Sequence, residues 1–260
     1  MVKIDKFAVV ESGAEIGEGT EIGPFSYIGK DVKIGKNCKI GPNCVISGNT
    51  EIGNNNVFVS HAAVGGPPQD IGYKGEETRL LIGDNNIFRE FVTINRATTK
   101  ENKLTQIGSN CLLMAYVHIA HDCQVGNNII FANNATLAGH VKVGSFSTVG
   151  ALSAVHQFCT VGEHAFIGGG SILTRDVLPF VKTVGSRGEG KIFGINTIGL
   201  ERKGFPKETI EALKSAYRIL FNSKMLLTEA LKVCEEKYGD VKEVAYLIKF
   251  IKESKRGIQR

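Results

Sequence analysis

Apolar side chains recur at every sixth position over most of the first 173 residues. The series starts at Ile4 and continues to Val64, resumes at Ile82, and after a shift in phase runs from Ile107 to Leu173. A glycine often follows the apolar residue, and a small or β-branched residue stands four positions after it. Neither the 3.6-residue period of a helix nor the alternation of a strand explains this spacing. The pattern predicts a chain that runs straight for a few residues, turns a corner and repeats, with the apolar side chain inside.

Three such sides close a triangular coil of about 18 residues, and stacked coils pair as parallel strands. The predicted fold class is therefore mainly β, a left-handed parallel β-helix of the hexapeptide-repeat type. Beyond Pro206 the apolar spacing becomes helical, as in Ile210, Leu213 and Tyr217. We expect two or three amphipathic helices that cap the end of the solenoid, with a break at Gly239.

These patterns predict two domains, a β-helix over residues 1–204 and a helical domain over residues 205–260. The six-residue rhythm breaks twice, at residues 66–81 and 97–106. Loops that leave a rigid repeat scaffold often carry binding and catalytic residues. We therefore expect both loops to belong to a functional site.

Composition excludes several classes of protein. Glycine is abundant, with 31 in 260 residues, but 29 of them precede residue 205 and none follows a collagen period. The net charge is +5, of which the tail from Phe205 carries +4 (12 basic against 8 acidic residues), so nucleic-acid binding is not expected. The basic excess of the tail is compatible with an acidic protein partner or with solubility alone.

The sequence contains neither a run of about 18 apolar residues nor a signal-peptide core, so we expect no integral membrane segment and a cytoplasmic location. Five of the six cysteines occupy the small fifth position of a hexad, which favours packing over disulfide or metal chemistry. They are Cys38, Cys44, Cys111, Cys123 and Cys159.

Five of the six histidines fall within residues 116–164. Three hexads that start 18 residues apart each carry one, so His121, His140 and His156 are predicted to stack on one side of three consecutive coils. His118 ends the preceding hexad and is expected at the adjacent corner. The repeat alone would not gather imidazoles in this way.

Three interpretations of this histidine column remain open. It is a set of packed or solvated side chains, or a zinc site as in hexapeptide-repeat carbonic anhydrases, or the base of an acyl transfer. For the third, a histidine would take the proton of a sugar hydroxyl that attacks a thioester, and a backbone N–H at Gly139 would stabilise the oxyanion. Because adjacent strand residues point to opposite faces, Asp122 would orient His121 only if the pair lies at a corner or acts through a neighbouring coil.

At these residues the sequence resembles the UDP-N-acetylglucosamine O-acyltransferases. The resemblance rests on VHIAHDCQVGN, FANNATLAGHV, AVHQFC, the PPQD of the first loop and the Gly194–Gly204 stretch. It implies transfer of an (R)-3-hydroxyacyl chain from acyl carrier protein to the 3-hydroxyl of UDP-N-acetylglucosamine, the first step of lipid A synthesis. It also implies a homotrimer with the site between adjacent solenoids, no metal, and no cofactor beyond the phosphopantetheine of the carrier protein.

The resemblance assigns roles to individual residues. His121 corresponds to the general base, Asp122 to its orienting partner and Gly139 to the oxyanion donor. Gly169 corresponds to the position that limits acyl length, and a glycine there predicts a longer chain. The remaining substrate-binding residues that it implies are Gln69, Asp70, Asn95, His118, His140, His156, Gln157, Asn196 and Arg202.

Three positions depart from the family pattern. Asn95 stands where a second histidine is frequent, Gly72 where a lysine is expected, and Ile198 where a glutamate is expected. Some branches of the family acylate a 2,3-diamino sugar and form an amide. The acceptor atom, oxygen of UDP-GlcNAc or nitrogen of UDP-GlcNAc3N, therefore stays open on the sequence.

Overall fold

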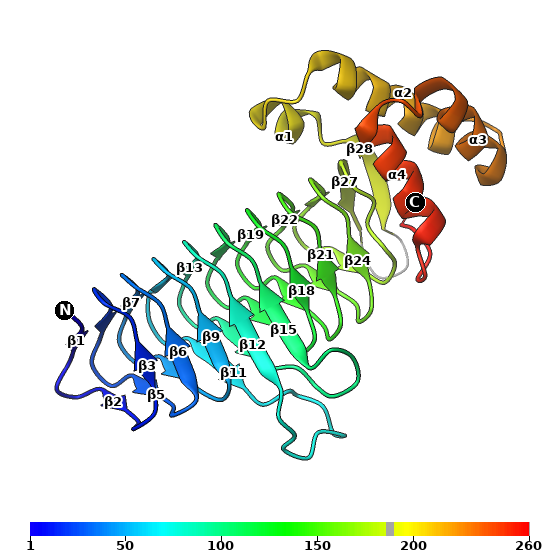
Figure 1. Cartoon of the computed structure of the whole chain (residues 1–260). Coiled ribbons are helices and arrows are strands. Elements are labelled where there is room, and N and C mark those ends of the chain that lie inside the picture. The colour runs from blue at the N-terminus through cyan, green and yellow to red at the C-terminus, as the bar shows by residue number, and fades with distance from the viewer. Residues whose placement is uncertain (186–189, 260) are drawn as a thin grey trace.

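The computed structural model describes residues 1–185 and 190–259, which form a three-sided parallel β-helix followed by a helical cap (Figure 1). Successive strands belong in turn to three sheets. The eleven-stranded sheet contains β1 (Lys3–Ile4), β4 (Glu21–Ile22), β7 (Lys39–Ile40), β10 (Val57–Phe58), β13 (Ile87–Phe88), β16 (Leu112–Leu113), β19 (Ile130–Phe131), β22 (Thr148–Val149), β25 (Phe166–Ile167), β27 (Val181–Val184) and β28 (Lys191–Ile195). The nine-stranded sheet contains β2 (Val9–Val10), β5 (Tyr27–Ile28), β8 (Val45–Ile46), β11 (Ala63–Gly66), β14 (Thr93–Asn95), β17 (His118–Ile119), β20 (Thr136–Leu137), β23 (Ala154–Val155) and β26 (Ile172–Leu173). The eight-stranded sheet contains β3 (Glu15–Ile16), β6 (Val32–Ile34), β9 (Thr50–Ile52), β12 (Arg79–Ile82), β15 (Leu104–Ile107), β18 (Gln124–Val125), β21 (Lys142–Val143) and β24 (Thr160–Val161).

The predicted periodicity sets the register of the coils. Ile22 pairs with Ile40, and Leu137 with Val155, so each aliphatic residue lies above its counterpart 18 residues earlier. These side chains form one continuous buried core. The small fifth residue of a hexad completes the corner: the buried Thr20 hydroxyl donates to the Gly35 carbonyl oxygen and accepts from the Cys38 N–H.

All six cysteines are buried with free thiols, in agreement with their predicted packing role. Burial raises the pKa of the Cys123 thiol to about 12, so this thiol is a poor nucleophile.

Both interruptions of the repeat leave the scaffold at the same corner, where the chain passes from the nine-stranded to the eight-stranded sheet. We call it the loop-bearing corner. The first loop joins β11 to β12 and the second joins β14 to β15, and both project from one edge of the solenoid (Figure 1). Strands β12 and β15 include Arg79–Ile82 and Leu104–Ile107, so the loops are shorter than the predicted ranges, because the strands resume before the hexad phase does.

Beyond Pro206 the described chain contains three helices, within the two or three that the sequence pattern predicts, and a fourth, short helix precedes them. The helices are α1 (Thr197–Arg202), α2 (Lys207–Asn222), α3 (Leu227–Tyr238) and α4 (Lys242–Glu253). Helix α1 falls inside the segment predicted as solenoid, since six residues are too few to show a helical period. The break between α3 and α4 at Gly239 is as predicted. The predicted domain ranges also include residues 186–189 and 260, which lie outside the described residues.

The cap covers the C-terminal end of the solenoid. Strand β28 pairs antiparallel with β27, and α2 contacts β28. The chain then returns to the end of the solenoid, where Ile258 pairs with Asp176. Within the described residues, no helix is both long and apolar enough to span a membrane.

Candidate active site

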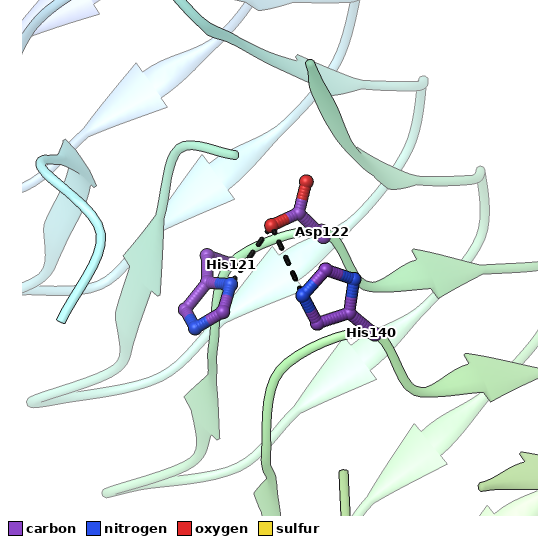
Figure 2. A group of neighbouring side chains, drawn as sticks. All are labelled: His121, Asp122 and His140. Carbon is purple, nitrogen blue, oxygen red and sulfur yellow. Dashed lines mark hydrogen bonds and ion pairs between the residues drawn. The ribbon is translucent and has the colours of Figure 1, made fainter. Parts of the chain in front are cut away.

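His121 and Asp122 lie at the loop-bearing corner, directly after β17. Asp122 has a φ of 61°, so the backbone turns sharply and the two adjacent side chains face each other instead of opposite sides. His121 Nδ1 lies 2.8 Å from Asp122 Oδ2 (Figure 2). This corner geometry meets the condition under which Asp122 can orient the imidazole. The hydrogen bond leaves His121 Nε2 as the nitrogen available to a substrate.

Asp122 is buried and surrounded by donors. The backbone N–H and the hydroxyl of Thr98 both donate to Asp122 Oδ2, at 3.0 and 2.7 Å. Asp122 donates its own N–H to Thr105 Oγ1. Burial opposes ionisation of this carboxyl, but the hydrogen bonds from His121 and Thr98 hold its pKa below the ordinary value. The residue beside His121 is therefore a carboxylate at neutral pH.

His140 occupies the same corner one coil further along and is also buried. Its ring meets that of His121 edge-on, with 5.2 Å between ring centroids, and stacks on Phe158 at 4.5 Å. His140 Nε2 lies 3.7 Å from Asp122 Oδ2 (Figure 2), and its Nδ1 lies 3.3 Å from Glu101 Oε1. The predicted stacking of His121 and His140 on consecutive coils is thus present.

Gly139 lies against the His121 ring. A Cβ atom at this position would lie 2.5 Å from His121 Cε1 and 2.8 Å from Nε2, so only glycine leaves room for the imidazole. Within the described part of the chain, the Gly139 N–H has no hydrogen-bond acceptor. The N–H at the equivalent position of an earlier coil, that of Lys30, donates to the Glu11 carboxylate at 2.9 Å. A free donor that can bind an anion therefore lies beside His121.

The two loops meet through an ion pair between Asp70 and Lys100. Lys100 Nζ lies 2.5 Å from Asp70 Oδ2, and the Gly72 N–H donates to Asp70 Oδ1. These two contacts lower the pKa of Asp70, and His121 is close enough to contribute. Position 72, where the family pattern expects a lysine, is glycine, and the basic group that reaches Asp70 comes from the second loop instead.

Two further predicted residues flank this centre. His118 Nδ1 lies 2.7 Å from Thr93 Oγ1, and burial lowers the pKa of His118, with a smaller contribution from His121. Asn95 is buried, and its amide donates to the Pro67 carbonyl oxygen at the base of the first loop. Its Oδ1 has no partner among the described residues.

The structure does not bring every predicted residue to this centre in one chain. His156 and Gln157 lie one coil beyond His140 on the loop-bearing corner, where His156 Nδ1 is 3.4 Å from the Arg256 guanidinium. Gly169 lies on the corner between the eleven- and nine-stranded sheets, and the exposed Arg202 ends α1. Asn196 occupies the N-cap position of α1, and its side-chain amide donates to the His164 carbonyl oxygen.

Gln69 is an exposed residue of the first loop with no side-chain partner in the described ranges. It therefore stays a prediction from the resemblance, without a contact in this chain that supports it.

The geometry does not favour a metal at the histidine pair. The nearest ligand atoms of His121, Asp122 and His140 all lie within 4.8 Å of one another. However, the two closest of these atoms, His121 Nδ1 and Asp122 Oδ2, are hydrogen-bonded to each other, and two Thr98 donors occupy the same carboxylate oxygen. A cation bound through these two atoms would have to displace all three hydrogen bonds.

Three residues of the second loop were not predicted from the sequence: Thr98, Lys100 and Glu101. They contact Asp122, Asp70 and His140 respectively. The break in the hexad rhythm marked this loop as functional, but nothing in its composition indicates which side chains turn inward.

Comparisons with known proteins place this geometry in context. A family model described as "Udp N-acetylglucosamine O-acyltransferase; Domain 2" matches residues 176–259, and the bacterial transferase hexapeptide model matches residues 1–30, 31–66 and 104–139. A protein of Burkholderia orbicola named acyl-[acyl-carrier-protein]--UDP-N-acetylglucosamine O-acyltransferase is 51% identical, over the full length of both chains. One of the same name from Stenotrophomonas maltophilia is 46% identical over 80% of this chain and 79% of its own.

Solved structures agree over nearly the whole chain. The UDP-N-acetylglucosamine acyltransferase of Francisella novicida superposes with a TM-score of 0.95 at 38% identity, covering 99% of this chain and 94% of its own. That of Campylobacter jejuni gives 0.92 at 44% identity and covers 99% of both chains. These similarities confirm the predicted fold class, a left-handed parallel β-helix with a helical cap.

Proposed function

This chain belongs to the UDP-N-acetylglucosamine O-acyltransferase family, and from that premise we propose how its site performs the reaction. It is an acyltransferase that moves an (R)-3-hydroxyacyl chain from acyl carrier protein to the 3-hydroxyl of UDP-N-acetylglucosamine, at the start of lipid A synthesis. The observation that carries the mechanism is the pairing of His121 with a buried carboxylate beside a free backbone N–H. Residues 1–204 would form the acyltransferase domain and residues 205–260 a helical domain.

His121 is the general base of this reaction. A sugar hydroxyl has a pKa far above 7, so it attacks a thioester effectively only when its proton leaves as the new bond forms. The Asp122 carboxylate fixes the tautomer with the proton on Nδ1, leaves Nε2 to accept the hydroxyl proton, and stabilises the imidazolium that results. The oxygen then bonds to the thioester carbonyl carbon.

Gly139 stabilises the negative charge that develops on the carbonyl oxygen. Its N–H lies beside the base and has no acceptor within the described residues. An aligned donor of this kind is worth about 10²-fold in rate. When the tetrahedral intermediate collapses, the carbon–sulfur bond breaks, and the proton held on His121 Nε2 passes to the departing phosphopantetheine thiolate. No metal or further cofactor is needed for these steps.

Asp70, with Lys100 beside it, would bind the glucosamine hydroxyls at the mouth of the site. Both residues belong to loops that leave the loop-bearing corner, and Asp70 is close enough to His121 for the two side chains to interact electrostatically. Gln69, Asn95, His118 and His140 would line the same cleft. The resemblance assigns His156, Gln157, Asn196 and Arg202 to further contacts with the substrate, and Gly169 to the end of the acyl channel.

A homotrimer would complete the site. Gly169 and Asn196 lie at other corners than His121, so they could join it only from a second copy, and heterologous contacts of this kind form a ring when the rotation between copies closes. The corner between the eleven- and nine-stranded sheets supports this arrangement. In an isolated chain this corner would leave a column of apolar side chains in water. They are Phe7, Phe25, Phe91, Tyr116 and Leu152.

Neither alternative from the sequence is favoured. The relatives are named O-acyltransferases, which supports ester formation over transfer to the 3-amino group of UDP-GlcNAc3N. The hydrogen bonds that occupy His121 Nδ1 and Asp122 Oδ2 disfavour the zinc site of a carbonic anhydrase. The partners of the reaction, acyl carrier protein and a UDP-sugar, agree with the expected cytoplasmic location.

Product analysis tests this function directly. The purified protein would be incubated with (R)-3-hydroxyacyl carrier proteins of several chain lengths and with UDP-GlcNAc or UDP-GlcNAc3N, and the products identified by mass spectrometry. We expect an ester of UDP-GlcNAc and a longer rather than a shorter preferred chain. Acylation of UDP-GlcNAc3N alone would overturn the assigned acceptor, and no acylation of either sugar would overturn the function.

A further inference from the structure

One short segment of the second loop, residues 98–101, contacts three predicted site residues. Thr98, which is buried, donates twice to the carboxylate of Asp122, while Lys100 and Glu101 turn toward Asp70 and His140. Lys100 and Glu101 are largely in contact with solvent, where ion pairs contribute little. Thr98 is the member whose contacts are shielded from water.

Thr98 belongs to a chain of hydrogen bonds that ends at the base. The Lys100 N–H donates to Thr98 Oγ1, the Thr98 hydroxyl donates to Asp122 Oδ2, and the same oxygen accepts from His121 Nδ1. A hydroxyl that accepts a backbone N–H has its own proton directed away from that donor, here toward the carboxylate. The second oxygen, Asp122 Oδ1, has no partner among the described residues, so the carboxylate is held entirely through Oδ2 and its backbone.

We propose that Thr98 is a positioning residue of the catalytic base: its hydroxyl and N–H fix the Asp122 carboxylate in the orientation that holds the His121 tautomer. The proposal rests on the proposed function, because it assumes that His121 removes the proton of the acceptor. Thr98 itself does not touch the reacting atoms. Its effect passes through Asp122.

Removal of the hydroxyl changes the proton affinity of the pair as well as its geometry. With one donor fewer on Oδ2, the carboxylate is less stabilised as an anion, and the His121–Asp122 pair binds a proton more tightly. The neutral base then persists only at higher pH. The other ionisable groups that face the pair are unchanged by the substitution: His118 from β17, His140 from the next coil, and Asp70, Lys100 and Glu101 from the two loops.

The test compares Thr98→Val, which keeps the shape and the backbone N–H, with Thr98→Ser, which keeps the hydroxyl. For Thr98→Val we expect kcat to fall roughly tenfold with KM for UDP-GlcNAc nearly unchanged, and the acid limb of the kcat profile to move up by as much as about one pH unit. Thr98→Ser should have a kcat within about threefold of the wild type and an acid limb close to the wild-type position.

A matched control separates positioning from simple loss of stability. Thr20 is equally buried, and its hydroxyl also donates once and accepts once, but in an N-terminal coil far along the chain from the site. Thr20→Val should lower the melting temperature at least as much as Thr98→Val and leave the pH profile in place. An unmoved acid limb in Thr98→Val, or a serine variant as impaired as the valine variant, would overturn the proposal.

An NMR titration gives a readout that does not depend on turnover. In protein labelled at the histidine side chains, the His121 resonances, assigned with His121→Ala, should titrate at higher pH in Thr98→Val than in the wild type. If the wild type acylated neither sugar, the proposed function would fail, while this titration would still decide whether Thr98 acts on the pair. An unchanged His121 titration would refute the role of Thr98 even in an active enzyme.

Discussion

Gly139→Ala tests whether the close approach of the His121 ring to the corner backbone is required for catalysis. The added Cβ would lie 2.5 Å from His121 Cε1, and ordinary contacts of this kind lie near 3.4–4 Å, so the ring has to retreat by about 1 Å. A misplacement of ~1 Å at a reacting group costs about 10²-fold, or ~2.7 kcal/mol of activation free energy. We therefore expect kcat to fall by about two orders of magnitude.

The fold should tolerate this change, because the atoms nearest to the added Cβ belong to a side chain and not to the backbone. The assay is steady-state kinetics with saturating acyl carrier protein substrate, together with a melting curve. Gly29→Ala is a matched control on an earlier turn of the same corner, where the added Cβ would meet its nearest neighbour at an ordinary 3.4 Å. Wild-type kcat in Gly139→Ala, or equal losses in both variants, would refute the assigned position of the base.

Three further predictions concern stability, assembly and the carrier protein. Burial lowers the pKa of His164. The contribution of the neutral imidazole to stability is therefore complete above the unfolded-state pKa near 6.5 and is lost as the pH falls below that value. His164→Phe, which keeps the stack between Phe146 and Phe180, should flatten the fall of the melting temperature between pH 7 and 5, and an unchanged slope would contradict this. Phe91→Glu places a charge in the exposed apolar column and should shift the proposed trimer toward monomer in light-scattering measurements, whereas Lys33→Glu on the charged face of the eight-stranded sheet should not. A Phe91→Glu variant with the oligomeric state of the wild type would place the proposed interface elsewhere. If the basic tail docks the acidic carrier protein, kcat/KM for the acyl donor should fall as salt rises from about 0.05 to 0.3 M while kcat stays constant, and rates indifferent to salt would count against docking by charge.

The fold could be predicted from the sequence because every hexad repeats the same physical requirement. An inward aliphatic residue and a small corner residue recur at Ile119, Leu137 and Val155, and the shared register alone predicts that His121 and His140 lie on neighbouring coils. The short helix α1 has no such redundancy. Its six residues show no period, and it forms where Asn196 bonds to the His164 carbonyl oxygen of the solenoid.

Contacts made by the loops could not be predicted in the same way. The pairing of His121 with Asp122 depends on a left-handed backbone at Asp122, which the sequence allows but does not require. The inward turn of Thr98 and the reach of Lys100 to Asp70 depend on how two loops fold against each other, and neither loop carries a repeat. The loops could be identified from the broken rhythm, but their side-chain partners could not.

The proposed mechanism depends on His121, held by Asp122, as the base that activates the sugar hydroxyl. The most direct test measures acyl transfer to UDP-GlcNAc by His121→Ala in a single turnover, with the product identified by mass spectrometry and the assembly state checked in parallel. We predict a loss of at least about 10³-fold in rate with an unchanged oligomer and unchanged binding of UDP-GlcNAc. A rate within about tenfold of the wild type in a correctly assembled variant would rule out His121 as the base.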